Sequence, residues 1–171
     1  MKKQFLAVSA LALAVMSGSA LAAPQDVQFV GTVTDVTCDI QASVNGSTNN
    51  YVQLGNAPLN NTAPEVLFSL KPAAGTSCDL KGANTASVTW IGSFDGEGLM
   101  AQSGAAHDAK ALLVAKPGNG AEVEIKKTLT QVDFAASELT SNNGLQFGAK
   151  LQGGATPGDY ISSAAFLMQY N

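Results

Sequence analysis

Arginine is absent from this chain of 171 residues, and its nine basic residues face thirteen acidic ones, which gives a formal net charge of −4. Arginine and clustered positive charge are the main means by which proteins hold phosphates and read bases. Because the chain lacks both, we expect neither nucleic acid nor an anionic membrane surface as a partner.

Groups suited to catalysis or metal binding are equally scarce. The single histidine, His107, is followed by Asp108, but no nucleophile stands near them and no G-x-S-x-G, HExxH, CxxC or phosphate-loop motif occurs. Asp95 and Glu97, in "FDGEG", lack the further ligands that a calcium loop needs, so this stretch is interpreted as a surface turn. The sequence predicts no catalytic residue, metal or cofactor, and a secreted hydrolase is disfavoured. Trp90 is expected in the core, with carbohydrate stacking as the alternative.

The one long apolar run lies at the start of the chain. Residues 1–22 combine a basic "MKK", an apolar core and the small-residue site Ala20-Leu21-Ala22, which indicates a signal peptide cut after residue 22. The run is too short for a confident membrane anchor, and no second run of spanning length follows. We therefore expect an exported domain, residues 23–171, without direct membrane insertion.

Cysteine is limited to Cys38 and Cys78. An even count in an exported chain indicates a disulfide, whereas a reactive or metal-binding pair would need histidines or further cysteines that are missing.

Short runs rich in valine, isoleucine, threonine and aromatic residues alternate with glycine, asparagine and proline. These runs are expected to be strands: residues 26–40, 49–56, 65–72, 86–94, 110–116, 122–134, 145–151 and 159–170. The pattern predicts an all-β antiparallel sandwich or barrel. Residues 101–115 contain the only candidate for a helical turn.

The C-terminal run is unusually apolar for the end of a domain. One face of this predicted strand carries Tyr160, Ser162, Ala164, Phe166, Met168 and Tyr170. The opposite face is also largely apolar or small, which is typical of a strand buried on both sides with a neighbour at each edge. Because the run ends the sequence, one neighbour has to come from an earlier segment or from another molecule.

The run that follows the signal peptide alternates in the same way. Val27, Phe29, Gly31 and Val33 share one face, and the glycine indicates close approach of another chain segment. The stretch from Val27 to Ile40 is long for one strand. It is either a single bent core strand or a free arm, residues 23–34, ahead of a body formed by residues 35–171.

Taken together, these features resemble the pilin subunits of chaperone–usher fimbriae, over essentially the whole exported chain. The matching features are the arm pattern Val27-x-Phe29-x-Gly31-x-Val33, cysteines forty positions apart, Gly158 at the fourteenth position from the end, and the penultimate Tyr170. Each is weak alone, and Gly158 and Tyr170 would otherwise be an ordinary turn residue and a core aromatic.

The resemblance implies an incomplete immunoglobulin-like β-sandwich that lacks its final strand. It implies that Val27, Phe29, Gly31 and Val33 form a donor strand, and that Gly158, Tyr160, Ala164, Phe166, Met168 and Tyr170 belong to the acceptor groove and chaperone-binding strand. The expected partners are further copies and related pilins, a periplasmic chaperone and an outer-membrane usher, on a route to the cell surface. The expected function is a structural subunit of an adhesive fimbria. The alternative is a subunit that itself binds a host glycan or protein receptor through surface loops such as residues 94–108.

Overall fold

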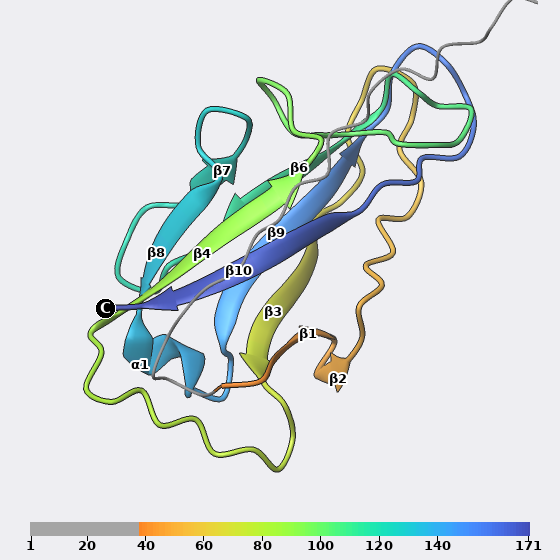
Figure 1. The fold of residues 1–171 in the computed structure, drawn as a ribbon. Coiled ribbons are helices and arrows are strands. Elements are labelled where there is room, and N and C mark those ends of the chain that lie inside the picture. The colour runs from red at the N-terminus through yellow and green to blue at the C-terminus, as the bar shows by residue number, and fades with distance from the viewer. Residues whose placement is uncertain (1–37) are drawn as a thin grey trace, which may run out of the picture. The chain divides into compact units, whose positions relative to one another are not determined.

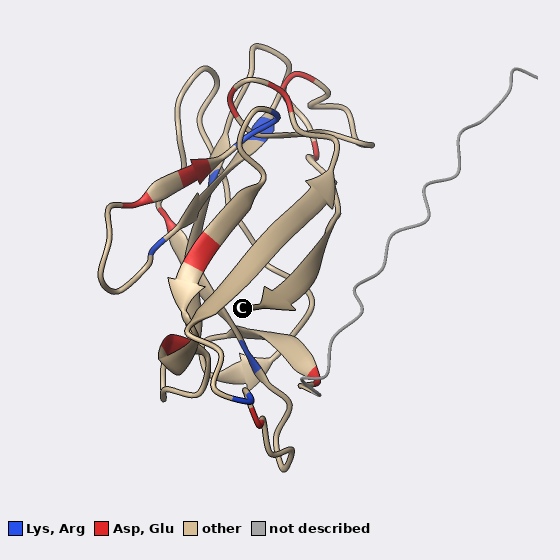
Figure 2. Ribbon diagram, turned by 60° about the vertical axis from the view of Figure 1, so that its left-hand side comes forward, with Lys and Arg blue, Asp and Glu red and all other residues tan. Residues whose placement is uncertain are grey.

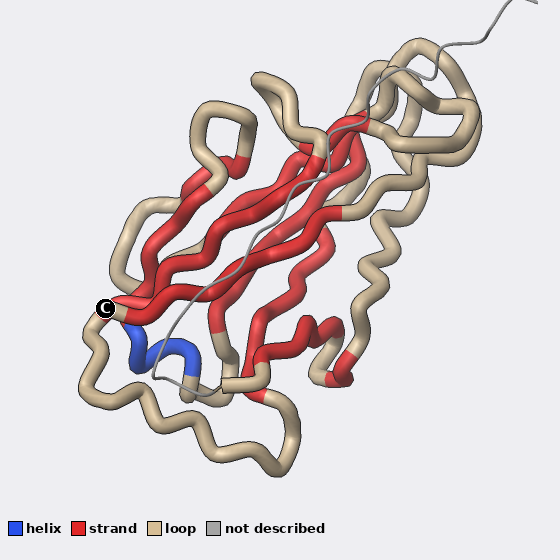
Figure 3. The backbone as a smooth tube through the Cα atoms, in the orientation of Figure 1, coloured by secondary structure: helices blue, strands red, loops and turns tan. Residues whose placement is uncertain are grey.

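The computed structural model describes residues 38–171, which form two antiparallel sheets and one short helix (Figures 1 and 3). The larger sheet has the order β2-β1-β3-β9-β6-β5, with β7 also paired to β6. Its strands are β1 (Ile40–Val44), β2 (Ser47–Thr48), β3 (Val66–Pro72), β5 (Leu99–Met100), β6 (Lys110–Ala115), β7 (Val123–Ile125) and β9 (Leu145–Gln152). The smaller sheet has the order β10-β4-β8, formed by β4 (Thr85–Gly92), β8 (Gln131–Ala135) and β10 (Ala164–Tyr170).

Alternation of apolar residues explains why the sheets pack face to face. In β4, Ala86, Val88 and Trp90 are buried, and they meet buried residues of β3, β6 and β9 in one core cluster. Trp90 stands edge-on to Phe68 and Phe147, with ring centroids 6.2 and 5.4 Å away. These contacts join the two sheets, since Trp90 belongs to the small sheet and both phenylalanines to the large one. The predicted all-β sandwich and the core position of Trp90 are confirmed.

The predicted disulfide is also present. Cys38 and Cys78 are bonded across a sequence separation of 40 residues. Cys38 precedes β1 and Cys78 follows β3, two strands that pair from Ile40–Pro72 to Val44–Phe68. The bond therefore fixes the end of the β1–β3 ladder that lies farthest from the β1–β2 turn.

Several sequence-based boundaries were wrong. Residues 49–56 form no strand, the run 122–134 is divided into β7 and β8, and β10 begins at Ala164 rather than at 159. The two-residue strand β5 and the helix α1 (Ala136–Leu139) were not predicted. Residues 101–109 contain no helix, and β6 follows them. Of the predicted first strand, 26–40, only residues 38–40 lie within the described part. The signal peptide and the arm lie outside it.

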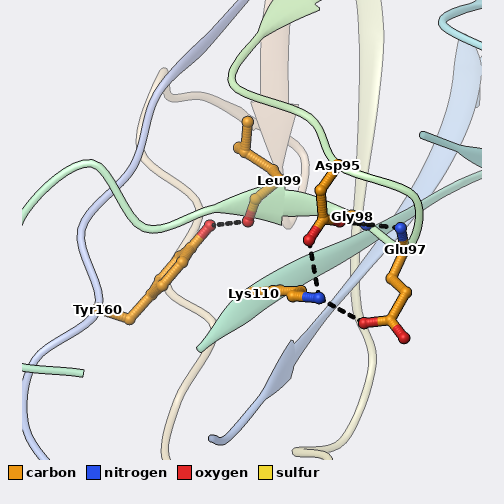
Figure 4. Close-up of polar contacts among 6 residues, drawn as sticks. All are labelled: Asp95, Glu97, Gly98, Leu99, Lys110 and Tyr160. Atoms are coloured by element: carbon orange, nitrogen blue, oxygen red, sulfur yellow. Dashed lines mark hydrogen bonds and ion pairs between the residues drawn. The ribbon is translucent and has the colours of Figure 1, made fainter. Parts of the chain in front are cut away.

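The turn between β4 and β5 contains an anchored carboxylate (Figure 4). Asp95 accepts hydrogen bonds from the backbone N–H groups of Glu97 and Gly98, at 2.8 and 2.9 Å, and pairs with the Lys110 amino group at 2.7 Å. Burial acts to raise the pKa of Asp95, but the hydrogen bonds from Lys110, Gly98 and Glu97 outweigh it and hold the pKa at about 2. The predicted surface turn is thus tied to β6 through Lys110.

No helix within residues 38–171 is long and apolar enough to cross a membrane.

Replacing both cysteines by serine should lower the free energy of unfolding by about 4 kcal/mol, because the unfolded chain then regains the entropy of an open loop. Urea unfolding of the double variant Cys38→Ser/Cys78→Ser and of the wild type under non-reducing conditions provides the measurement. Equal midpoints would show that the bond adds no stability.

Asp95 should make stability depend on pH in the acid range. Its folded-state pKa of about 2 lies below the ordinary value of 3.8, so its contribution is present above about pH 4 and is lost as the pH falls through about 2. The free energy of unfolding of Asp95→Asn, measured in urea from pH 5 to pH 2, should therefore fall less than that of the wild type. Asp133→Asn is the matched control, since within residues 38–171 the Asp133 carboxylate accepts one hydrogen bond, from the Gln131 amide. Identical pH dependence in wild type and Asp95→Asn would contradict this account.

Candidate functional site

Strand β10 has a free edge. It pairs with β4 from Ala164–Gly92 to Tyr170–Ala86, and no other strand of the described chain pairs with it. The sequence pattern had predicted burial on both faces, which was wrong for residues 38–171, because Ala165 and Gln169 on the outer face are exposed and no residue of β10 is fully buried. The second neighbour, expected from an earlier segment or from another molecule, stays a prediction. The unpaired backbone groups of this edge are available to another strand.

The inner face of β10 packs on the core only in part. Ala164, Phe166, Met168 and Tyr170 all contact the core cluster while remaining partly exposed, and the Phe166 ring lies 5.8 Å from that of Trp90. Of the two faces defined by alternation, the one that carries Phe166 is thus the face that meets the core. Tyr160 and Ser162, which were assigned to the same face, precede β10 and contact β5 instead.

Next to β10 the core opens into a cleft of about 1530 Å³. Core residues Phe68, Leu70 and Trp90 line it, together with Phe166 of β10. Small-molecule pockets usually measure about 300–1,000 Å³. The size of the cleft and its apolar lining are better suited to a length of peptide.

The second side of the cleft is formed by the extended segment after β2, which Figure 1 shows running beside the sandwich. In this segment Val52 and Leu54 pack against the core, whereas Tyr51 and Gln53 are exposed. The sequence predicted a strand here, but residues 52–57 make no backbone hydrogen bond with any other described residue. Within residues 38–171 the cleft is therefore bordered on two sides by backbone without partners, a requirement for accepting an added strand.

Gly158 lies in the turn that leads to β10 and also lines the cleft. Its φ of +146° is unfavourable for other residues, and a Cβ there would stand 2.5 Å from the Cβ of Ala105. Glycine is needed here for the turn itself, whatever else this position does.

Two polar groups of the small sheet lack hydrogen-bond partners among the described residues: one on Trp90, which lines the cleft, and one on Tyr170, at the far end of β10. The Trp90 indole nitrogen and the Tyr170 hydroxyl are buried and bond to nothing in the described chain. Burial raises the pKa of Tyr170. Burial also raises the pKa of Tyr160, whose hydroxyl nevertheless donates to the Leu99 carbonyl at 2.9 Å. A buried polar group without a hydrogen-bond partner lowers the free energy of unfolding by about 1–3 kcal/mol, so these two groups destabilise the fold.

Charge is nearly absent from the site. The three strands of the small sheet carry a single charged residue, Asp133 (Figure 2). Among the described residues that line the cleft, only Asp159 is charged. Recognition in such a cleft has to rely on apolar contact and main-chain hydrogen bonds.

Loop residues singled out from the sequence do not form a reactive site. The Asp108 carboxylate accepts hydrogen bonds from Ala155 and Thr156, and His107 is exposed beside it. No group of three potential metal ligands occurs within residues 38–171. The loop 94–108, expected to bind a receptor in the alternative hypothesis, uses Asp95, Gln102 and Asp108 for contacts within the chain.

The predicted donor residues Val27, Phe29, Gly31 and Val33 lie outside the described residues. Sequence reasoning missed the contribution of Val52, Leu54 and Leu99 to the cleft. The alternation around Val52 and Leu54 was a usable signal, whereas nothing in the sequence marked Leu99.

Comparison with characterised proteins gives a consistent result over nearly the whole chain. It is 34% identical to the F107 fimbrial protein of Escherichia coli over 169 residues, which cover 98% of this chain and 99% of the relative. It is 32% identical to the major MR/P fimbria protein of Proteus mirabilis, with 95% of each covered, and 28% identical to the K99 fimbrial protein of Escherichia coli, with 99% of each covered. No protein-family model matches the chain. These relatives are fimbrial proteins and not enzymes, in agreement with the sequence prediction. The chain therefore belongs to the fimbrial subunits of the chaperone–usher type and is a structural subunit of a surface pilus.

Proposed function

We propose that this subunit polymerises by donor-strand exchange, in which the N-terminal arm of one copy fills the cleft beside β10 of the next. The observation that supports this most directly is the cleft itself, an apolar opening bordered by the free edge of β10 and by unpaired residues 52–57. The arm would add a strand between these two borders. A head-to-tail contact of this kind does not close on itself and produces a filament.

The dimensions of arm and cleft agree. An extended strand rises about 3.3 Å per residue, so the segment 50–57 spans about 26 Å and the arm from Val27 to Val33 about 23 Å. Alternate side chains of the arm, Val27, Phe29 and Val33, would enter the cleft. Their burial would contribute about 5–8 kcal/mol before ordering costs are subtracted.

Before assembly the cleft has to be covered, because an exposed apolar opening with a free strand edge promotes aggregation. We assign this task to a periplasmic chaperone that occupies β10 until an outer-membrane usher exchanges it for the arm of the next subunit. Gly158, Tyr160, Ala164, Phe166, Met168 and Tyr170 remain the proposed contact residues. The assembled fimbria would support adhesion at the cell surface.

Gly31→Val should block polymerisation, because a branched side chain would meet the cleft where the arm approaches most closely. The exported chain, residues 23–171, is refolded by dilution from denaturant, and its mass distribution is followed by light scattering after size-exclusion chromatography. We expect polymers from the wild type and assembly at least about tenfold slower from Gly31→Val. Thr32→Val, on the opposite face of the arm, should assemble like the wild type.

A peptide of residues 23–36, added in excess, should compete with the arm and shorten the wild-type polymers. Normal polymers from Gly31→Val, or no effect of the peptide, would refute the proposed exchange.

Tyr170→Ser should reduce the amount of subunit that co-purifies with the chaperone, because it removes a large apolar contact from the inner face of β10. Tyr170→Phe should retain the wild-type amount, since the hydroxyl has no partner to lose. Leu167→Ser is the control variant, because it also replaces an apolar side chain of β10 by serine, but on the outer face of the strand. Equal yields of Tyr170→Ser and wild type would argue against capture through this face.

A further inference from the structure

The segment before β10 is held by the turn and strand that follow β4. We name residues 95–103 the β5 clamp. Ile161 and Ser103 exchange two backbone hydrogen bonds of 3.1 Å, and Gln102 N–H donates to the Ile161 carbonyl at 2.9 Å. Side chains add four hydrogen bonds. The Tyr160 hydroxyl donates to the Leu99 carbonyl (2.9 Å) and the Ser162 hydroxyl to the Met100 carbonyl (2.7 Å). The Gln102 amide nitrogen donates to the Ser163 carbonyl (3.0 Å), and the Ser163 hydroxyl donates to the Gln102 amide oxygen (2.9 Å). The clamp is thus the main attachment of residues 160–163.

These bonds cross from one sheet to the other. Leu99 and Met100 pair with Ala111 and Lys110 of β6, in the large sheet, whereas residues 160–163 lead directly into β10 of the small sheet. Leu99 and Tyr160 also line the cleft. The clamp therefore ties the two sheets together at one end of the opening, beside the free strand.

The clamp depends on Asp95 for its own position. Strand β5 has only two residues, which is too short to be stable by its ladder alone. Asp95 ties the preceding turn to Lys110 of β6 (Figure 4). Its backbone carbonyl also accepts a 2.7 Å hydrogen bond from Lys127 N–H. Gly98 allows the turn to lie against β6, since a Cβ there would collide with the Ala111 carbonyl.

The two carboxylates around Lys110 differ in exposure. The Asp95 side chain is 27% exposed and that of Lys110 is 24%, whereas Glu97 is 64% exposed. Partly buried, multiply bonded charges hold geometry better than exposed pairs, which contribute little. Asp95 is therefore the anchor, and Glu97 is a peripheral partner of the same lysine.

We propose that Asp95 is a positioning residue for strand exchange, acting through the β5 clamp to hold the β10 border of the cleft at the distance from residues 52–57 that one inserted strand needs. This inference rests on the proposed function. A strand that pairs on both sides requires borders about 10 Å apart, twice the spacing between neighbouring strands. Holding this distance before the arm arrives lowers the ordering cost of insertion.

The test uses Trp90, the only tryptophan in the sequence, as a reporter inside the cleft. The exported chain is refolded at low concentration, the peptide of residues 23–36 is added, and the change in tryptophan fluorescence gives the association rate. Asp95→Asn is compared with Glu97→Gln, because each removes one negative charge next to Lys110.

We expect association about tenfold slower for Asp95→Asn and within about twofold of the wild type for Glu97→Gln. Tyr160→Phe removes a bond within the same clamp, so its effect and that of Asp95→Asn should not add in the double variant.

Hydrogen exchange separates positioning from general destabilisation. In Asp95→Asn, exchange should accelerate at residues 160–165 and stay unchanged in β4 and β8, whereas a purely structural role would accelerate all of them. If the wild type binds the peptide and Asp95→Asn binds it at the same rate, this inference is overturned, but the proposed exchange is not. A wild type that does not bind the peptide would instead overturn the proposed exchange.

Discussion

An unsatisfied strand edge is the constraint on which the rest of this structure depends. Within residues 38–171, β10 has backbone partners on one side only, and beyond its other side the core opens between the sheets. Backbone N–H and C=O groups near an apolar core need partners, and exposed core residues need cover. One added strand would satisfy both requirements at once, which explains why the free edge and the open core occur at the same place.

The remaining architecture keeps this opening ordered. The aromatic contacts of Trp90 with Phe68 and Phe147 join the sheets beneath the cleft, so the floor stays formed although one border of the sandwich is missing. The disulfide holds the β1–β3 ladder, and the β5 clamp holds the segment before β10. For the proposed exchange, preorganisation of this kind would matter because a cleft that had to fold around an added strand would bind that strand more weakly.

The sequence predicted those parts of the fold that depend on residue type and local alternation. The disulfide and the core position of Trp90 follow from such patterns, whereas alternation in β10 defined two faces without showing which one meets the core. Residues 49–56 show the limit of the method, since their composition predicted a strand but cannot reveal whether a neighbouring strand exists. β5 was missed because it has only two residues, and contacts such as that between Asp95 and Lys110, fifteen positions apart, have no local signature. The residue pattern left open whether β10 has a second neighbour in its own chain, because an apolar strand has the same sequence whether its neighbour is present or absent; only the resemblance implied a missing strand.

The near absence of charge around the cleft has a consequence for how such subunits diversify. An occupant of an uncharged cleft is selected by the shape and volume of its side chains, and this selection does not depend on the electrostatic character of the rest of the molecule. The lysines and acidic residues of the described chain lie mainly in loops and on the large sheet (Figure 2). Those surfaces can change in evolution without altering the shape or the apolar lining of the cleft.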